Sequence, residues 1–183
     1  NVSATNHWST CILPFDAALP EGVQAYESLK HDEANLYLKE AKSIEAYTPY
    51  ILYSEKGYSG TLSGTVDPQK YPESGVVTKG YLHGAIVQQP VTSGYVLQNL
   101  SEGVKFYQIA EGSTFSIPAG KCWMTLPDAS VKSLNFIFED DEDAIVEVND
   151  ISVKSDILYN LSGQRVEKAT KGIYIRNGKK VLY

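Results

Sequence analysis

Residues 95–109 read YVLQNLSEGVKFYQI, two β-forming runs joined by Ser101, Glu102 and Gly103. Both runs contain Tyr, Val, Phe and Ile, which are enriched in strands. Gly103 can adopt the positive φ angle that closes a tight turn without a steric penalty. The stretch therefore predicts an antiparallel β-hairpin.

The same alternation of β-forming runs and turn residues continues on both sides of this hairpin. Short strands separated by Gly, Pro, Asn, Asp and Ser are typical of an all-β sandwich or barrel. Residues 21–46 have the composition of a short helix, but Leu36 and Leu38 alternate with their neighbours as in a strand. We predict an all-β fold, an antiparallel β-sandwich of about ten strands, over 8–15, 23–29, 36–41, 50–53, 61–66, 76–88, 95–100, 104–109, 122–126 and 134–138.

Two segments of the chain resemble each other. Residues 44–52 read IEAYTPYIL and residues 117–125 read IPAGKCWMT. Each has Ile-x-Ala, then three residues, then a large aromatic residue that opens a predicted strand. The match suggests that one local unit is used twice, at a corner where the chain changes direction. Two separated copies are too few for a solenoid.

Charge and hydropathy exclude several classes of partner. The 183 residues carry a net charge of −6, whereas a protein that binds the nucleic-acid backbone needs clustered Lys and Arg. No apolar run reaches the roughly 20 residues of a transmembrane helix. The chain has 13 Tyr but only 5 Phe. This bias favours strands whose side chains are partly exposed to water. We therefore expect no nucleic-acid partner and no transmembrane segment.

The two cysteines, Cys11 and Cys122, are far apart in the sequence and show no metal-ligand spacing. Cys11 alternates with Leu13 and Phe15 on an apolar face, as a buried free thiol would. A disulfide between the two cysteines is the alternative if the protein is secreted. The sequence leaves both readings open.

An acidic run, EDDED, occupies residues 139–143. We interpret it as a solvated linker. A calcium site is the alternative, but the alternating acids and central Gly of an EF-hand loop are absent. The run predicts a boundary between a β-sandwich domain over residues 1–140 and an acidic linker with a small β tail over residues 141–183.

The tail carries its own turn signals. Asn177-Gly178 lies between two β-forming runs and is a strong hairpin signal, because both residues tolerate positive φ angles. Gly163 and Gly172 mark two earlier turns. We expect a small antiparallel sheet of about four short strands, too small to bury a core alone.

The tail also resembles a known class of C-terminal segments. YNLSGQRV (159–166) and KGIYIRNGKK (171–180) are similar to the endings of many secreted and surface proteins of the Bacteroidetes. Such endings look like the sorting domains of the type IX secretion system. The resemblance implies an extracytoplasmic protein of a Gram-negative bacterium, secreted or held at the outer-membrane surface, whose tail engages secretion machinery.

The body resembles a β module found before such tails. WSTCILPFDAALPEGVQAY (8–26) is similar to the opening of that module, and the two Ile-x-Ala corners are similar to its paired corners. Some leucine-rich-repeat surface adhesins of these bacteria end in similar modules. The resemblance implies a module of a surface or secreted protein, either a whole mature protein or the C-terminal part of a longer one.

No spaced catalytic motif is present. His7, His31 and His83 are widely separated and form no paired metal motif. The stretch SGTLSG has the wrong spacing for a nucleophile elbow. We therefore expect no enzyme activity, no catalytic residue, no metal and no cofactor.

A glycan is the ligand class that the aromatic residues suggest, because sugar rings pack against exposed aromatic faces. The candidate contacts are Trp8, Trp123, Tyr50, Tyr53 and Tyr58. Both Trp residues lie in apolar runs, where burial in the core is the simpler expectation.

Our leading hypothesis is a non-enzymatic, extracytoplasmic structural or adhesion-associated module. The alternative is a glycan-binding, lectin-like β-sandwich. The expected partner is a glycan or protein of the cell surface or of a host. Exposure of Trp8 and Trp123 in an aromatic groove would favour the alternative.

Overall fold

A computed structural model describes residues 1–127 and 131–139, together with four strands of the tail at 158–159, 165–166, 173–176 and 179–182. The chain divides into two compact units, Asn1–Ala144 and Ile145–Tyr183. Most of the acidic run lies outside the described residues, so the linker stays a prediction.

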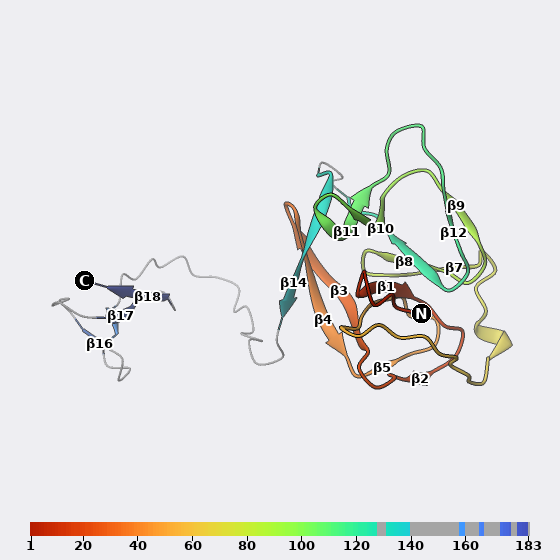
Figure 1. Cartoon of the computed structure of the whole chain (residues 1–183), viewed down its shortest axis with the longest axis horizontal. Helices are drawn as coiled ribbons and strands as arrows, with labels where there is room; N and C mark the ends of the chain where they lie inside the picture. The colour runs from red at the N-terminus through yellow and green to blue at the C-terminus, as the bar shows by residue number, and fades with distance from the viewer. Residues whose placement is uncertain (128–130, 140–157, 160–164, 167–172, 177–178, 183) are drawn as a thin grey trace. The chain divides into compact units, whose positions relative to one another are not determined.

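The first half of the body contains six strands, drawn in red and orange in Figure 1. The strands are β1 (Trp8–Cys11), β2 (Ala17–Ala18), β3 (Gln24–Asp32), β4 (Asn35–Ala41), β5 (Ser43–Ile44) and β6 (Tyr50–Tyr53). β1 pairs antiparallel with β6, β3 and β4 form a hairpin, and β2 pairs with β5.

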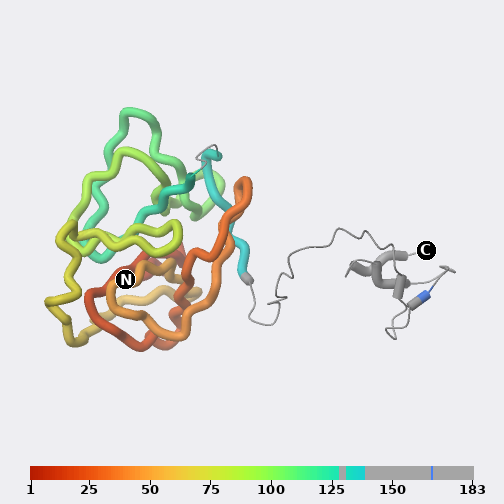
Figure 2. The backbone as a smooth tube through the Cα atoms, turned by 180° about the vertical axis from the view of Figure 1, so that it is seen from behind, coloured from red at the N-terminus to blue at the C-terminus, as the bar shows by residue number. Residues whose placement is uncertain are grey.

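The second half repeats these three pairs of strands and adds one further strand at its start. The pairs β8–β13, β10–β11 and β9–β12 correspond to β1–β6, β3–β4 and β2–β5. The two halves form separate lobes of the backbone when viewed from behind in Figure 2. The strands are β7 (Val76–Lys79), β8 (Leu82–Ala85), β9 (Gln89–Val91), β10 (Tyr95–Leu100), β11 (Gly103–Gln108), β12 (Phe115–Ile117) and β13 (Lys121–Met124).

Strand β14 (Ser133–Glu139) joins the two halves. It pairs in parallel with β4 and antiparallel with β11. The sheet order is β1-β6-β3-β4-β14-β11-β10-β13-β8-β7, so equivalent strands follow in reverse order on the two sides of β14. This placement is visible in Figure 1, where β14 (cyan) runs beside β4 and β11.

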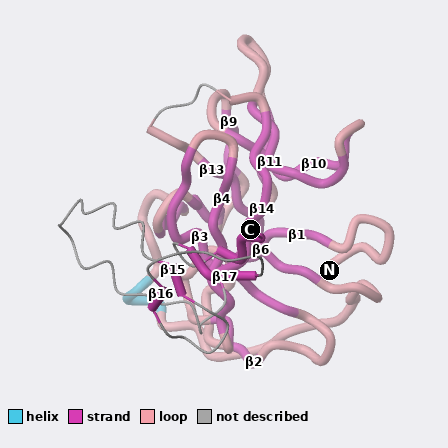
Figure 3. Tube along the Cα trace, turned by 90° about the vertical axis from the view of Figure 1, so that its left-hand side faces the viewer, coloured by secondary structure: helices cyan, strands magenta, loops and turns pink. Residues whose placement is uncertain are grey.

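The all-β prediction is confirmed, and Figure 3 shows strands throughout the body with one short 3₁₀ turn, η1 (Pro68–Lys70), in cyan. The sheet differs from the predicted antiparallel sandwich, because β14 makes it mixed. It also curls on itself: the ring of Trp8 on β1 lies 4.8 Å from that of Phe136 on β14, although three strands separate them in the sheet order.

The two Ile-x-Ala corners have the same structure. Tyr47 and Gly120 both adopt a positive φ, 57° and 81°. Their amides donate to the carbonyl oxygens of Leu13 and Ala85, each at 2.7 Å. The corner therefore turns the chain between a short strand and the last strand of each half. Gly120 adopts this left-handed conformation without steric strain because it has no Cβ atom. Tyr47 has a Cβ atom and adopts it at a steric cost.

The core repeats in the same way. One buried cluster belongs to the first half and contains Val23, Ile44 and Tyr50; another belongs to the second half and contains Val96, Ile117 and Trp123. The three pairs have the same separation along the chain. A third cluster draws on strands of both halves and on β14, and its fully buried members include Leu36, Leu38, Phe106 and Leu134.

Two predicted strands differ from the structure. Residues 61–66 form no strand, because they are exposed except for Leu62 and offer no apolar face. Residues 76–88 form the β7–β8 hairpin instead of one strand, since Gly80 turns the chain with a φ of 58°.

The tail forms the predicted antiparallel sheet of four strands. Their order is β16-β15-β17-β18, with β15 at Leu158–Tyr159, β16 at Arg165–Val166, β17 at Ile173–Arg176 and β18 at Lys179–Leu182. Arg176 pairs with Lys179 across the position of the predicted Asn-Gly turn, which itself lies outside the described residues.

Candidate functional site

Besides the extra strand β7, the two halves differ in one strand pairing, and a cleft lies beside it. In the first half β3 and β6 pair over three residues of each strand. The equivalent strands of the second half, β10 and β13, pair only at Tyr95 and Met124. Beyond that pair they separate, and β1 of the first half packs against β13 there.

Thr10 holds β1 against β13. Its Oγ1 accepts a hydrogen bond from the Cys122 amide at 2.9 Å and donates to the Cys122 carbonyl oxygen at 3.4 Å. Thr10 is only 5% exposed. A side chain thus replaces the ladder of backbone hydrogen bonds that normally joins two strands.

Thr10→Val is expected to lower the free energy of unfolding by about 2 kcal/mol, because it leaves the buried Cys122 amide unsatisfied. Thr10→Ser restores the hydroxyl and serves as the matched control, with a loss of about 1 kcal/mol for the missing methyl group. Urea unfolding followed by fluorescence measures both. Equal losses for the two variants would contradict the role of the hydroxyl.

Lys121 lies at the same junction. Its Nζ donates to Ser9 Oγ at 2.6 Å and to the Thr10 carbonyl oxygen at 3.3 Å. The side chain is half-buried. The ammonium therefore links the start of β13 to the middle of β1, with neutral acceptors on both bonds.

The cleft between β1, β10 and β13 has a volume of about 260 Å³. This is just below the roughly 300–1,000 Å³ of small-molecule sites, so the cleft suits one small ring. Two aromatic side chains and a few polar groups line it, which is the usual composition of a ligand site. We name it the Trp8 cleft; its lining includes Trp8, Ser9, Gln98, Phe115, Ile117 and Lys121.

Three aromatic side chains pack around Trp8 and fix its position. Its ring centroid lies 4.8 Å from that of Tyr53 and 4.8 Å from that of Phe136, and both pairs are tilted. Phe138 stacks on it at 6.0 Å. The indole is half-buried, so part of it remains available in the cleft while the rest is held in one orientation.

The structure separates the other candidate glycan contacts from this cleft. Trp123 is 9% exposed and stacks on His83 at 5.1 Å, and Tyr50 is 1% exposed. Both rings belong to the core and present no surface to a ligand. Tyr53 supports Trp8, and Tyr58 lines a different hollow of about 270 Å³ next to Cys11.

His83 is the best-connected histidine. Its Nδ1 is hydrogen-bonded to Thr78 Oγ1 at 2.8 Å and its Nε2 to Thr125 Oγ1 at 2.6 Å. Burial lowers the pKa of its imidazole. The two hydroxyls and the Trp123 ring fix the imidazole in place, as expected for a structural histidine.

Both cysteines are free thiols in the structure. Cys122 Sγ donates to the Cys11 carbonyl oxygen at 3.3 Å. Burial raises the pKa of the Cys122 thiol and that of the Cys11 thiol. At both thiols the effect of burial outweighs that of the nearby Lys121 ammonium, so neither has the lowered pKa of a reactive cysteine.

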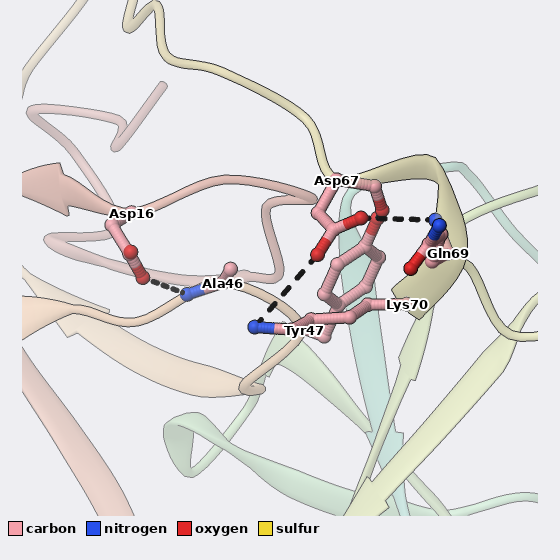
Figure 4. Close-up of polar contacts among 6 residues, drawn as sticks. All are labelled: Asp16, Ala46, Tyr47, Asp67, Gln69 and Lys70. Carbon is pink, nitrogen blue, oxygen red and sulfur yellow. Dashed lines mark hydrogen bonds and ion pairs between the residues drawn. The ribbon is translucent and has the colours of Figure 1, made fainter.

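The Tyr47 corner carries a second set of polar side chains, shown in Figure 4. Asp16 accepts from the Ala46 amide at 2.7 Å, and the Tyr47 hydroxyl donates to the Asp67 carbonyl oxygen at 3.2 Å. The Asp67 carboxylate accepts a hydrogen bond from the backbone N–H of Gln69 at 3.0 Å and lies 4.0 Å from Lys70 Nζ. These groups bond to one another and hold the exposed loop to the corner.

Within the described part of the chain, no three His, Cys, Asp or Glu side chains are grouped so as to hold a metal ion. No helix among the described residues is long and apolar enough to span a membrane.

Sequence reasoning found Trp8 but missed Phe115, Gln98 and Lys121, its partners in the cleft. Their positions follow from the separation of β10 from β13, which no local pattern encodes. Comparison with known proteins adds no further guide: the chain matches no family model, no curated protein and no solved structure.

Proposed function

We propose that this chain is a non-enzymatic, adhesion-associated module that binds a glycan in the Trp8 cleft. The observation that carries the proposal is the half-buried Trp8 indole, fixed by Tyr53 and Phe136 and lining a cleft with Phe115. A rigid aromatic face packs against the C–H groups of a sugar ring without losing side-chain entropy.

Polar groups beside the two rings support the same ligand class. Gln98, Ser9 and Lys121 line the cleft, and a sugar's hydroxyl groups need donors and acceptors of this kind. An apolar wall with a few convergent polar groups is the composition expected for such a ligand.

The proposed location is extracytoplasmic, at the surface of a Bacteroidetes-like bacterium or secreted from it. Support comes from the resemblance of residues 159–180 to sorting tails and of residues 8–26 to the module that precedes them. An antiparallel sheet of four short strands in the tail suits such a role, in which the tail engages secretion machinery.

A glycan array followed by calorimetry on the best ligand tests the proposal. Trp8→Leu keeps an apolar side chain but removes the aromatic face, and we expect it to weaken binding about tenfold or more, whereas Trp8→Phe retains most of the affinity. Tyr71→Ala removes an exposed aromatic residue outside the cleft and should leave binding unchanged. Absence of binding to any glycan, or equal affinity of Trp8→Leu and the unmodified protein, would overturn the proposal.

A further inference from the structure

Lys121 is the one charged side chain among the residues that line the Trp8 cleft, and no Asp or Glu is among them. We propose that the cleft selects a sugar that carries a carboxylate, such as a uronic acid or a sialic acid. This inference rests on the proposed glycan-binding function and names its ligand class.

Among the described residues, Lys121 bonds only to neutral acceptors. An ammonium has three N–H donors, and two of them go to neutral acceptors, Ser9 Oγ and the Thr10 carbonyl oxygen. Within the described residues, no carboxylate lies within ion-pair distance of Lys121. A half-buried charge without a counter-ion is unfavourable, so an anionic ligand would be stabilised there.

Three other lysines of the body do have a carboxylate partner. Lys79 Nζ lies 3.0 Å from Glu27, Lys105 Nζ lies 3.1 Å from Glu102, and Lys70 Nζ lies 4.0 Å from Asp67. A second hollow that Lys121 also lines has no acidic residue in its lining. In a chain of net charge −6, the surroundings of Lys121 are a local exception.

The aromatic wall and the cation line the same small cleft. The Ser9 hydroxyl, which also lines it, is 2.6 Å from Lys121 Nζ. A ring packed on Trp8 thus places a substituent near the remaining N–H of the ammonium. The small volume of the cleft favours a carboxylate on that same ring over one on a distant residue.

Paired oligosaccharides test the inference on the full chain. Calorimetry would compare glucuronic-acid-terminated and sialic-acid-terminated oligosaccharides with the same sugars after reduction of the carboxyl group to an alcohol. We expect the acidic forms to bind about tenfold more tightly or better, since a charge-assisted hydrogen bond is lost on reduction. The preference should shrink as salt is raised.

Lys121→Met is expected to remove the preference, so that the acidic and the reduced forms bind this variant with equal affinity. Lys105→Met, outside the cleft, is the matched control and should keep the preference. Equal binding of acidic and reduced forms to the unmodified protein would overturn this inference while the glycan-binding proposal stands. Binding of no sugar of either form would overturn both. The comparison of ligands on the unmodified protein holds even if Lys121→Met fails to fold.

Discussion

Gly94→Ala is expected to lower the free energy of unfolding by about 3 kcal/mol or more. Gly94 has a φ of 98°, and a Cβ atom added there would lie 2.3 Å from the Met124 carbonyl oxygen. The left-handed conformation costs a non-glycine residue about 1–2 kcal/mol. The clash lowers the free energy of unfolding by a further amount of about 1–3 kcal/mol, because the opposing atom belongs to the backbone and cannot rotate away.

Gly103→Ala is the matched control, since Gly103 has a φ of 90° but no atom within 4 Å of the added Cβ. We expect it to lose about 1–2 kcal/mol, for the conformation alone. Denaturant unfolding of both variants measures the difference. Gly94 directly precedes Tyr95, which makes the single pair between β10 and β13, so Gly94→Ala should also weaken ligand binding. Equal stability of the two variants would contradict the close approach between Gly94 and the Met124 carbonyl oxygen.

Phe106→Ala is expected to destabilise the body by about 3–5 kcal/mol. Phe106 is fully buried in the core shared by the two halves, and its ring meets that of Phe136 edge-on at 6.1 Å. It also lies opposite Leu134 of β14. Removal of the ring leaves a cavity beside the strand that joins the halves.

Phe138→Ala provides the same substitution at a position that is 48% exposed. We expect a loss of about 1 kcal/mol there, because less apolar area returns to water. Thermal and urea unfolding of the two variants should differ accordingly. A loss below about 1.5 kcal/mol for Phe106→Ala would contradict the placement of this ring in a tightly packed core.

The local parts of the fold were predictable from the sequence. The Tyr95–Leu100 strand and its hairpin partner follow from composition and from Gly103, and the four tail strands follow from their turn residues. The resemblance between the two Ile-x-Ala segments pointed to a repeated corner, and the structure gives both corners the same hydrogen bond. The strands, the turns and the Ile-x-Ala pattern all depend on neighbours in the sequence.

Long-range features were not predictable in this way. The parallel pairing of β14 with β4 makes the sheet mixed, and it joins residues from opposite ends of the body. The Trp8 cleft likewise depends on the separation of two strands, so Phe115 and Lys121 carried no local signal. Tyr50 and Trp123 were candidate contacts by residue type, but each occupies the equivalent core position of its half.

The position of β14 also bears on the order of folding. Each half contains a hairpin of neighbouring strands that can form early, whereas β14 must find β4 across almost the whole body. Contacts between such distant residues slow folding. We therefore expect docking of β14 to limit the folding rate. Until it docks, β4 and β11 each expose an unpaired edge, through which two partly folded chains could associate.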